Sequence, residues 1–99
     1  ADLDTSMPSL AMVDDSMNTS YELGLTYLQM ELFEEAISEF TQALGDVHIA
    51  MNAQYNIAMC EYQLGRAGSA KQRLANLRRV PGLDDRLIKN IDRLLDVVG

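Results

Sequence analysis

The chain has 99 residues, which is enough for one domain and too few for two. Apolar residues make up 47% of it and charged residues 23%, the range of an ordinary soluble domain, which excludes a disordered or fibrous chain as a whole. The net charge of −7 disfavours nucleic acid and anionic lipid as partners, because phosphate groups repel an acidic chain. No stretch is apolar for long enough to span a bilayer, so we expect no direct membrane insertion.

The N-terminal residues 1–14 differ in composition from the rest of the chain. Pro8 and scattered Asp, Ser and Thr predict a linker. A short packed segment is the alternative, and the apolar side chains that favour it are Met7, Leu10, Met12 and Val13. These side chains could also fold back onto a binding groove as an internal ligand. The chain lacks an initiator Met and the basic start of a signal peptide, so we expect a fragment or a processed chain.

Residues 17–46 have the periodicity of two amphipathic helices. Apolar side chains from Tyr21 onward recur at steps of three and four residues, and Leu23 and Tyr27 widen this face. A short polar turn at residue 31 separates them from a second apolar stripe that begins at Phe33. Gly45 is expected to end the second helix as a C-cap in left-handed geometry.

The same pattern of two amphipathic helices returns 34 residues further along the chain. The aligned pairs that define this interval are Tyr21 with Tyr55, Ala36 with Ala70, and Phe40 with Leu74. We therefore predict a second unit over residues 51–80, whose first helix begins between residues 49 and 53. Pro81 and Gly82 then break the chain, and residues 83–98 form a third amphipathic pattern without a partner helix. This last helix is expected to cap the apolar face of the second unit.

Six residues of the first unit carry a resemblance to a known family, namely Leu23, Gly24, Tyr27, Ala36, Phe40 and Ala43. This pattern resembles the tetratricopeptide-repeat signature, in which small residues let two helices approach and aromatic residues fill the angle between them. The second copy is degenerate and has Ala58, Glu61, Leu74 and Leu77 where the signature has Gly, Tyr, Phe and Ala. The resemblance implies an all-α superhelix over residues 15–99, with two helix-turn-helix repeats and a solvating helix.

The resemblance also implies a concave groove, lined by the first helix of each repeat, that receives a peptide or a partner helix. Tyr and Met side chains offer adaptable apolar contact, amides can bond a peptide backbone, and basic groups can receive a carboxylate. For each Tyr, packing between helices is the alternative. The residues mapped to the groove are Asn18, Tyr21, Glu22, Leu25, Leu28, Gln29, Asn52, Tyr55, Asn56, Met59, Tyr62, Gln63, Arg86, Lys89, Asn90 and Arg93.

Chaperone-binding members of this family hold a peptide carboxylate with a clamp of Lys, Asn and Arg. Of the clamp positions, Asn56 and Arg86 fit, whereas Tyr21, Leu25 and Asn90 depart from the pattern. We therefore do not expect this chain to recognise a C-terminal chaperone tail.

Two functions follow from these observations, and neither needs a cofactor. The first is a protein-interaction scaffold that binds another protein or peptide in the groove. The alternative is a structural self-assembly element of a larger bacterial protein, because residues 1–65 sum to −11 and residues 66–99 to +4. Solvated helix faces that happen to differ in sign would give the same charges. A third alternative is a positioning domain within an enzyme.

Catalytic chemistry has little support in the sequence. Cys60 and His48 are the only thiol and imidazole, and their twelve-residue separation is about 18 Å along a helix, too far for a nucleophile and its base. No phosphate-binding glycine loop, Cys-x-x-Cys pair or His-rich metal spacing occurs. We therefore expect no enzyme, no cofactor and no metal site. The single cysteine excludes an internal disulfide and favours a reducing compartment, so we expect a cytoplasmic protein.

Overall fold

The computed structural model describes residues 16–99, which form five α-helices and no strand. The expected all-α fold is confirmed for this part of the chain. The prediction for residues 1–14, a linker or short packed segment, lies outside the described residues. The helices are α2 (Ser16–Gln29), α3 (Phe33–Gln42), α4 (Val47–Gln63), α5 (Ala67–Arg78) and α6 (Asp85–Val98).

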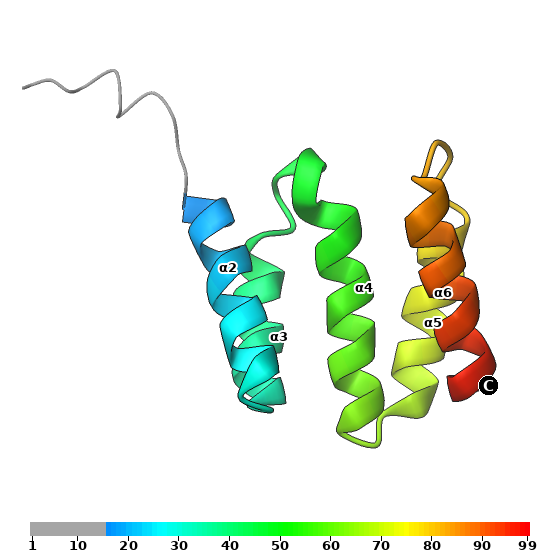
Figure 1. Cartoon of the computed structure of the whole chain (residues 1–99), viewed down its shortest axis with the longest axis horizontal. Coiled ribbons are helices and arrows are strands. Elements are labelled where there is room, and N and C mark those ends of the chain that lie inside the picture. The colour runs from blue at the N-terminus through cyan, green and yellow to red at the C-terminus, as the bar shows by residue number, and fades with distance from the viewer. Residues whose placement is uncertain (1–15) are drawn as a thin grey trace, which may run out of the picture.

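The five helices form two layers. Helices α2, α4 and α6 lie side by side and run in the same direction, with α3 and α5 behind them (Figure 1). Helix α4 is central and contacts each of the other four described helices. The arrangement leaves α2, α4 and α6 to form one surface of the molecule, which is the surface that carries the candidate site.

The turn between the two helices of each unit recurs at a fixed interval, whereas the outer ends of these helices do not. Helices α2 and α4 end at Gln29 and Gln63, and α3 and α5 begin at Phe33 and Ala67, so both boundaries recur at the interval that separates Tyr21 from Tyr55. The turns between these helices share one conformation, because Glu31 and its counterpart in the second unit both have positive φ (61° and 81°). The period seen in the sequence is thus also a period of the backbone.

Each of these turns is closed by the hydrogen bonds of a Schellman motif. The Leu32 amide donates to the Tyr27 carbonyl at 2.9 Å, and the Arg66 amide donates to the Glu61 carbonyl at 2.8 Å. The residue in the left-handed position is Gly65 in the second turn, where glycine avoids a Cβ clash. The first turn carries a glutamate there and bears the strain of an L-residue in that conformation.

A reciprocal pair of substitutions tests this equivalence. We expect Gly65→Ala to lower the free energy of unfolding by about 1 kcal/mol, because alanine is strained at positive φ. Nothing lies within 4 Å of a Cβ placed at residue 65, so the effect comes from the backbone alone. Glu31→Gly should raise the free energy of unfolding by up to about 1 kcal/mol. Urea unfolding measures both, and effects of the same sign would contradict the shared conformation.

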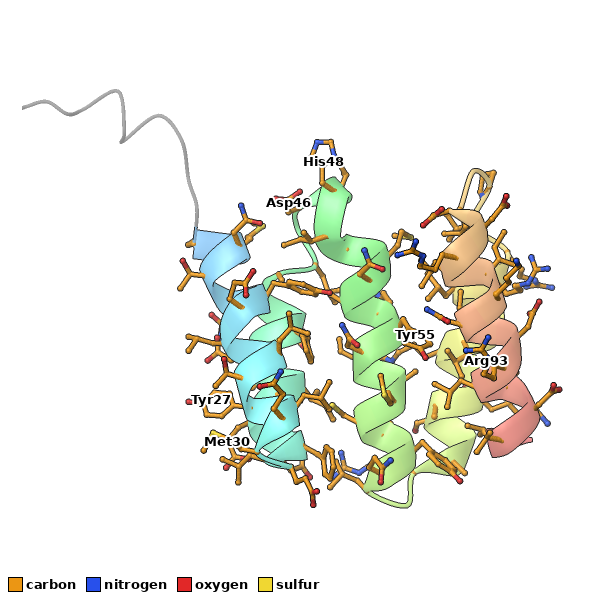
Figure 2. All side chains as sticks on the ribbon, in the orientation of Figure 1. Tyr27, Met30, Asp46, His48, Tyr55 and Arg93 are labelled. Carbon is orange, nitrogen blue, oxygen red and sulfur yellow. The ribbon has the colours of Figure 1, made fainter. Side chains whose placement is uncertain are left out.

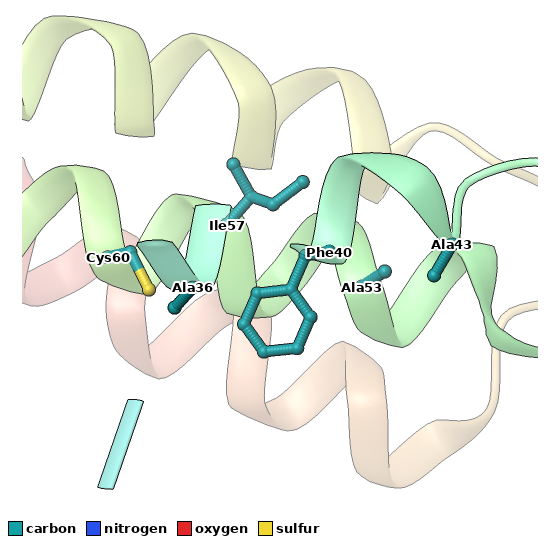
Figure 3. Packing of buried hydrophobic residues seen from close by; sticks show 6 residues of the cluster. All are labelled: Ala36, Phe40, Ala43, Ala53, Ile57 and Cys60. Carbon is teal, nitrogen blue, oxygen red and sulfur yellow. The ribbon is translucent and has the colours of Figure 1, made fainter. Parts of the chain in front are cut away.

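The first core cluster joins α3 to α4 around Phe40 (Figure 3). Its six buried residues are Ala36, Phe40, Ala43, Ala53, Ile57 and Cys60. Helix α2 approaches Phe40 closely, because a Cβ at Gly24 would lie 2.6 Å from Cε1 of its ring. Glycine at this position therefore lets α2 and α3 pack together with the aromatic ring between them.

The second core cluster joins α4, α5 and α6. Leu87 and Ile91 of α6 are buried there against side chains of the two preceding helices. Helix α6 therefore covers an apolar surface that α4 and α5 would otherwise expose. The remaining buried residues of the cluster are Ala58, Ala70, Leu74 and Leu77.

One side of α2 stays uncovered by the described helices. We call Leu23, Tyr27 and Met30 the outer face of α2, and Figure 2 shows Tyr27 and Met30 on the side away from α4. Leu23 is 42% exposed, whereas Ile57, its counterpart in the second unit, is 1% exposed because α3 packs against it. The predicted apolar face of α2 is thus only partly buried, since no described helix precedes it.

Two local predictions were wrong. Gly45 does not adopt left-handed geometry. A Cβ placed there would lie 2.6 Å from Cε of Met17, the end of a flexible side chain that can move aside. Helix α4 begins at Val47, earlier than predicted. The reason is a capping side chain, since Asp46 accepts a hydrogen bond from the His48 amide at 2.8 Å.

Candidate partner-binding groove

A hollow of about 270 Å³ opens between α2, α4 and α6. The three helices run in parallel, and each contributes residues to the hollow, most of them from its N-terminal or central part (Figure 1). We call this hollow the groove. Its lining residues are Tyr21, Leu25, Asn52, Tyr55, Asn56, Asp84, Arg86, Leu87 and Asn90.

A hydrogen bond between two helices fixes the groove wall. Nδ2 of Asn56 donates to the Tyr21 hydroxyl at 3.1 Å, and Asn56 as a residue is only 8% exposed. The Tyr21 ring also packs against Phe40, with ring centroids 5.5 Å apart and planes tilted by 58°. Tyr21 is therefore held from both ends, and its ring presents a preorganised apolar surface to the groove.

Both groove tyrosines are neutral phenols at physiological pH. Burial raises the pKa of Tyr21, the hydrogen bond from Asn56 opposes this shift, and the charge of Glu22 adds to it. Burial also raises the pKa of Tyr55, and the positive charge of Arg93 opposes the increase. Tyr55 projects from α4 toward α6, the helix that bears Arg93 (Figure 2). The rings thus offer apolar area together with hydroxyl groups that can donate or accept.

The charged residues of α6 are only partly separated between two faces, because Lys89 lies among the acids of one face. Arg86, Asn90 and Arg93 follow one another at steps of four and three residues, which places them on the edge toward the groove. Asp92 instead pairs with Arg78 of α5, with Nε and Oδ1 3.0 Å apart. The acids on that other face are Asp85, Asp92 and Asp96. The groove therefore has a basic edge along α6, and Asp84 at its end is the acid that lines it.

The structure gathers about half of the predicted groove residues. Leu87 and Asp84 line the groove without having been predicted, because the first belongs to the core stripe of α6 and the second to the loop before it. Tyr21 and Tyr55 both pack against core clusters, which confirms packing between helices, and both also line the groove. The predicted residues outside the hollow are Asn18, Glu22, Leu28, Gln29, Met59, Tyr62, Gln63, Lys89 and Arg93.

A second hollow, of about 430 Å³, lies on α4 and α5. A network of side chains crosses it, because Arg73 donates to both carboxylate oxygens of Glu61 at 3.1 and 3.2 Å. The same guanidinium donates to Oε1 of Gln54 at 2.6 Å. These three polar groups satisfy one another within the chain and are occupied before any ligand binds. The sequence marked Glu61 only as a departure from the repeat signature.

Cys60 and His48 both lie on α4, at its two ends. Cys60 is fully buried, and burial together with the charge of Glu61 raises the pKa of its thiol from 9.0 to about 11. His48 is exposed beside the N-cap of the helix. Within residues 16–99, no group of three or more His, Cys, Asp and Glu side chains could hold a metal ion.

The raised pKa of Cys60 predicts a loss of stability at high pH. The unfolded thiol ionises from pH 9 upward, whereas the folded thiol keeps its proton to about pH 11, so stability falls between these values. Two pKa units correspond to about 2–3 kcal/mol. A Cys60→Ala variant serves as the reference, because tyrosine ionisation affects its stability equally. We expect the free energy of unfolding of the wild type to fall by this amount more than that of the variant. Urea titrations at pH 8 and pH 11 measure the loss. A wild type and a variant that lose equal free energy of unfolding between these pH values would contradict a buried neutral thiol.

Comparisons of the chain with protein-family models, curated proteins and solved structures find no match. None of the helices described here has the length and apolar character that crossing a membrane requires.

Proposed function

We propose that this chain is a tetratricopeptide-like interaction module that binds an extended segment of another protein in the groove between α2, α4 and α6. The observation that carries the proposal is the Asn56–Tyr21 hydrogen bond, which joins the two parallel helices and fixes an aromatic wall. The regular recurrence of helix boundaries and turn conformation supports the family resemblance. No catalytic step is part of the proposal.

The groove combines the two kinds of contact that an extended segment needs. Tyr21, Leu25 and Tyr55 supply apolar area for the side chains of a ligand. The side chains of Asn52 and Asn90 form no hydrogen bond with any other described residue, so their amides are free for a peptide backbone. Because Tyr21 is already fixed, binding orders fewer side chains and loses less entropy.

Selection from a random-peptide display library, followed by affinity measurement, tests the proposal. We expect selected peptides to bind the wild type and to lose about tenfold or more in affinity to a Tyr55→Ser/Asn56→Ala variant, because the apolar area of Tyr55 is lost and Tyr21 loses the hydrogen bond that fixes it. Gln72→Ala/Asn76→Ala, on the larger hollow of α4 and α5, is the matched control and should bind as the wild type does. Circular dichroism must show equal helicity in all three chains. An unchanged peptide affinity in the Tyr55→Ser/Asn56→Ala variant would show that the groove is not the binding site.

A second candidate function is self-assembly. Residues 16–65 carry seven acidic and no basic residues, whereas residues 66–99 have a net charge of +4, so opposite ends of the row of helices differ in sign. The outer face of α2 adds exposed apolar area at the acidic end. Head-to-tail contact between copies would bring these surfaces together.

Light scattering over a range of protein and salt concentrations tests this candidate. Electrostatic assembly predicts a mass that rises with protein concentration and falls with added salt, because salt screens charges beyond about 10 Å at 0.1 M. A monomer at all concentrations would exclude self-assembly and leave the groove for a foreign partner.

A further inference from the structure

The chemistry of the groove indicates what kind of segment fits it. Its centre is apolar and aromatic, with Tyr21 and Leu25 on one side and Tyr55 on the other. Its far edge, along α6, carries Arg86, and Arg93 lies close enough to influence Tyr55. A complementary segment therefore has apolar side chains that lie over the rings and acidic groups that reach α6.

The N-terminal residues of this chain have that composition. Residues 1–15 contain four aspartates and no basic residue. Two of the aspartates, Asp2 and Asp4, lie at the start of the segment, and the apolar side chains come between them and the acidic pair next to α2. The apolar side chains after Asp4 are Met7, Leu10, Met12 and Val13.

The segment is also long enough to cross the groove. It joins α2 at Ser16, in the turn before Tyr21, at the end of the layer where α4 and α6 also begin (Figure 1). Adjacent helices pack about 10 Å apart, so the path from α2 across α4 to α6 is about 20 Å. An extended chain covers about 3.3 Å per residue, and six or seven residues suffice. The fifteen residues before α2 exceed this length.

We propose that residues 1–15 bind in the groove of their own molecule, with the apolar part over Tyr21 and Tyr55 and with Asp2 and Asp4 at the basic edge of α6. This inference rests on the proposed function, since it makes the N-terminal segment a competitor of the foreign partner. A partner then binds only the fraction of molecules whose groove is open, which lowers its apparent affinity.

The outer face of α2 is the rival surface for this segment, and charge disfavours it. Glu22 and Glu31 flank the outer face, and α2 and α3 contain no basic residue. Asp2 and Asp4 would meet like charge there, whereas the groove is lined by Arg86 beside Asp84, and Arg93 of the same helix acts on the groove residue Tyr55. The groove is thus favoured by electrostatics while both surfaces offer apolar contact.

Tryptophan fluorescence can locate the segment, because the chain has no Trp and Leu10→Trp creates a single reporter. We expect the reporter to be protected from acrylamide, and the quenching constant to rise about twofold or more when Arg86→Gln/Arg93→Gln is added. The matched control is Lys71→Gln/Arg79→Gln, which also removes two positive charges. Lys71 lies in α5 and Arg79 at its C-terminal end, and neither residue lines the groove. We expect no change of the quenching constant in this control. Protection must persist on dilution, as binding within one molecule requires.

Three outcomes would overturn the inference. The first is equal quenching in all of these chains, and the second is protection that disappears on dilution. The third is protection that Tyr27→Ser/Met30→Ser removes and the arginine variant does not, which would place the segment on the outer face of α2.

The same set of variants separates this inference from the proposed function. If the groove binds peptides but the segment does not occupy it, peptide affinity still depends on Tyr55 and Asn56 while the reporter stays exposed. If the segment does occupy it, Leu10→Ser/Met12→Ser should raise the affinity of a selected peptide about twofold or more, because more grooves are open. An unchanged affinity in that variant would count against the segment and leave the groove itself in place.

Discussion

Replacing Phe40 with alanine is expected to lower the free energy of unfolding by about 3–5 kcal/mol. The ring is fully buried between α2, α3 and α4, and it contacts Tyr21 at a centroid distance of 5.5 Å. Removing it leaves a cavity at the junction of the three helices and also frees the groove tyrosine. Because small domains have about 5–15 kcal/mol of stability in total, much of the chain should unfold at moderate urea concentration.

The second repeat supplies the control for this prediction. Leu74, the counterpart of Phe40 in that repeat, is also fully buried. Phe40→Leu should therefore cost less than Phe40→Ala, about 1–2 kcal/mol, since most of the volume is kept. Urea unfolding followed by circular dichroism measures both variants. Equal losses would contradict the cavity explanation, and no loss would contradict the packing of α2 onto α3.

Arg73→Ala is expected to lower the free energy of unfolding by about 2–3 kcal/mol. It leaves the Glu61 carboxylate, whose side chain is only 10% exposed, without its bidentate partner. The Arg73 side chain is itself 32% exposed, and water can partly replace it, so we expect less than the full cost of breaking a buried pair.

An exposed ion pair and a double variant make this prediction specific. Arg78→Ala removes a pair whose side chains are 45% and 52% exposed, and it should cost at most about 0.5 kcal/mol. Arg73→Met combined with Glu61→Leu should restore stability to within about 1 kcal/mol of the wild type, because no charge is then left unpaired. A double variant as unstable as Arg73→Ala would show that the charge pair is not the cause.

The sequence predicted the helices well because their signals are local. The apolar stripes on α2 and α3 and the polar turn at Glu31 fix helix positions within a few residues. The conformation of that turn was hidden, since glutamate does not signal positive φ, whereas Gly65 does. The role of Gly45 was misjudged because α3 ends at Gln42 and is capped by Ala43 in right-handed geometry, before Gly45 is reached.

The groove was predicted less completely than the helices. A repeat register places Tyr21, Tyr55 and Asn56 on the first helix of each unit, and the structure brings all three together. The register cannot say how far along each helix a hollow extends, so Met59 and Tyr62 were included although they lie beyond it. The Asn56–Tyr21 hydrogen bond joins side chains 35 residues apart, and no local pattern reveals such a contact.

Chemical-shift mapping of a selected peptide on the isotope-labelled chain tests whether the groove is the binding surface. If the peptide lies in the groove, we expect the largest shifts at the side-chain amides of Asn52, Asn56 and Asn90, together with changes at the Tyr21 and Tyr55 rings. Shifts centred on Gln72 and Asn76 would place the ligand on the larger hollow of α4 and α5 and would contradict the groove.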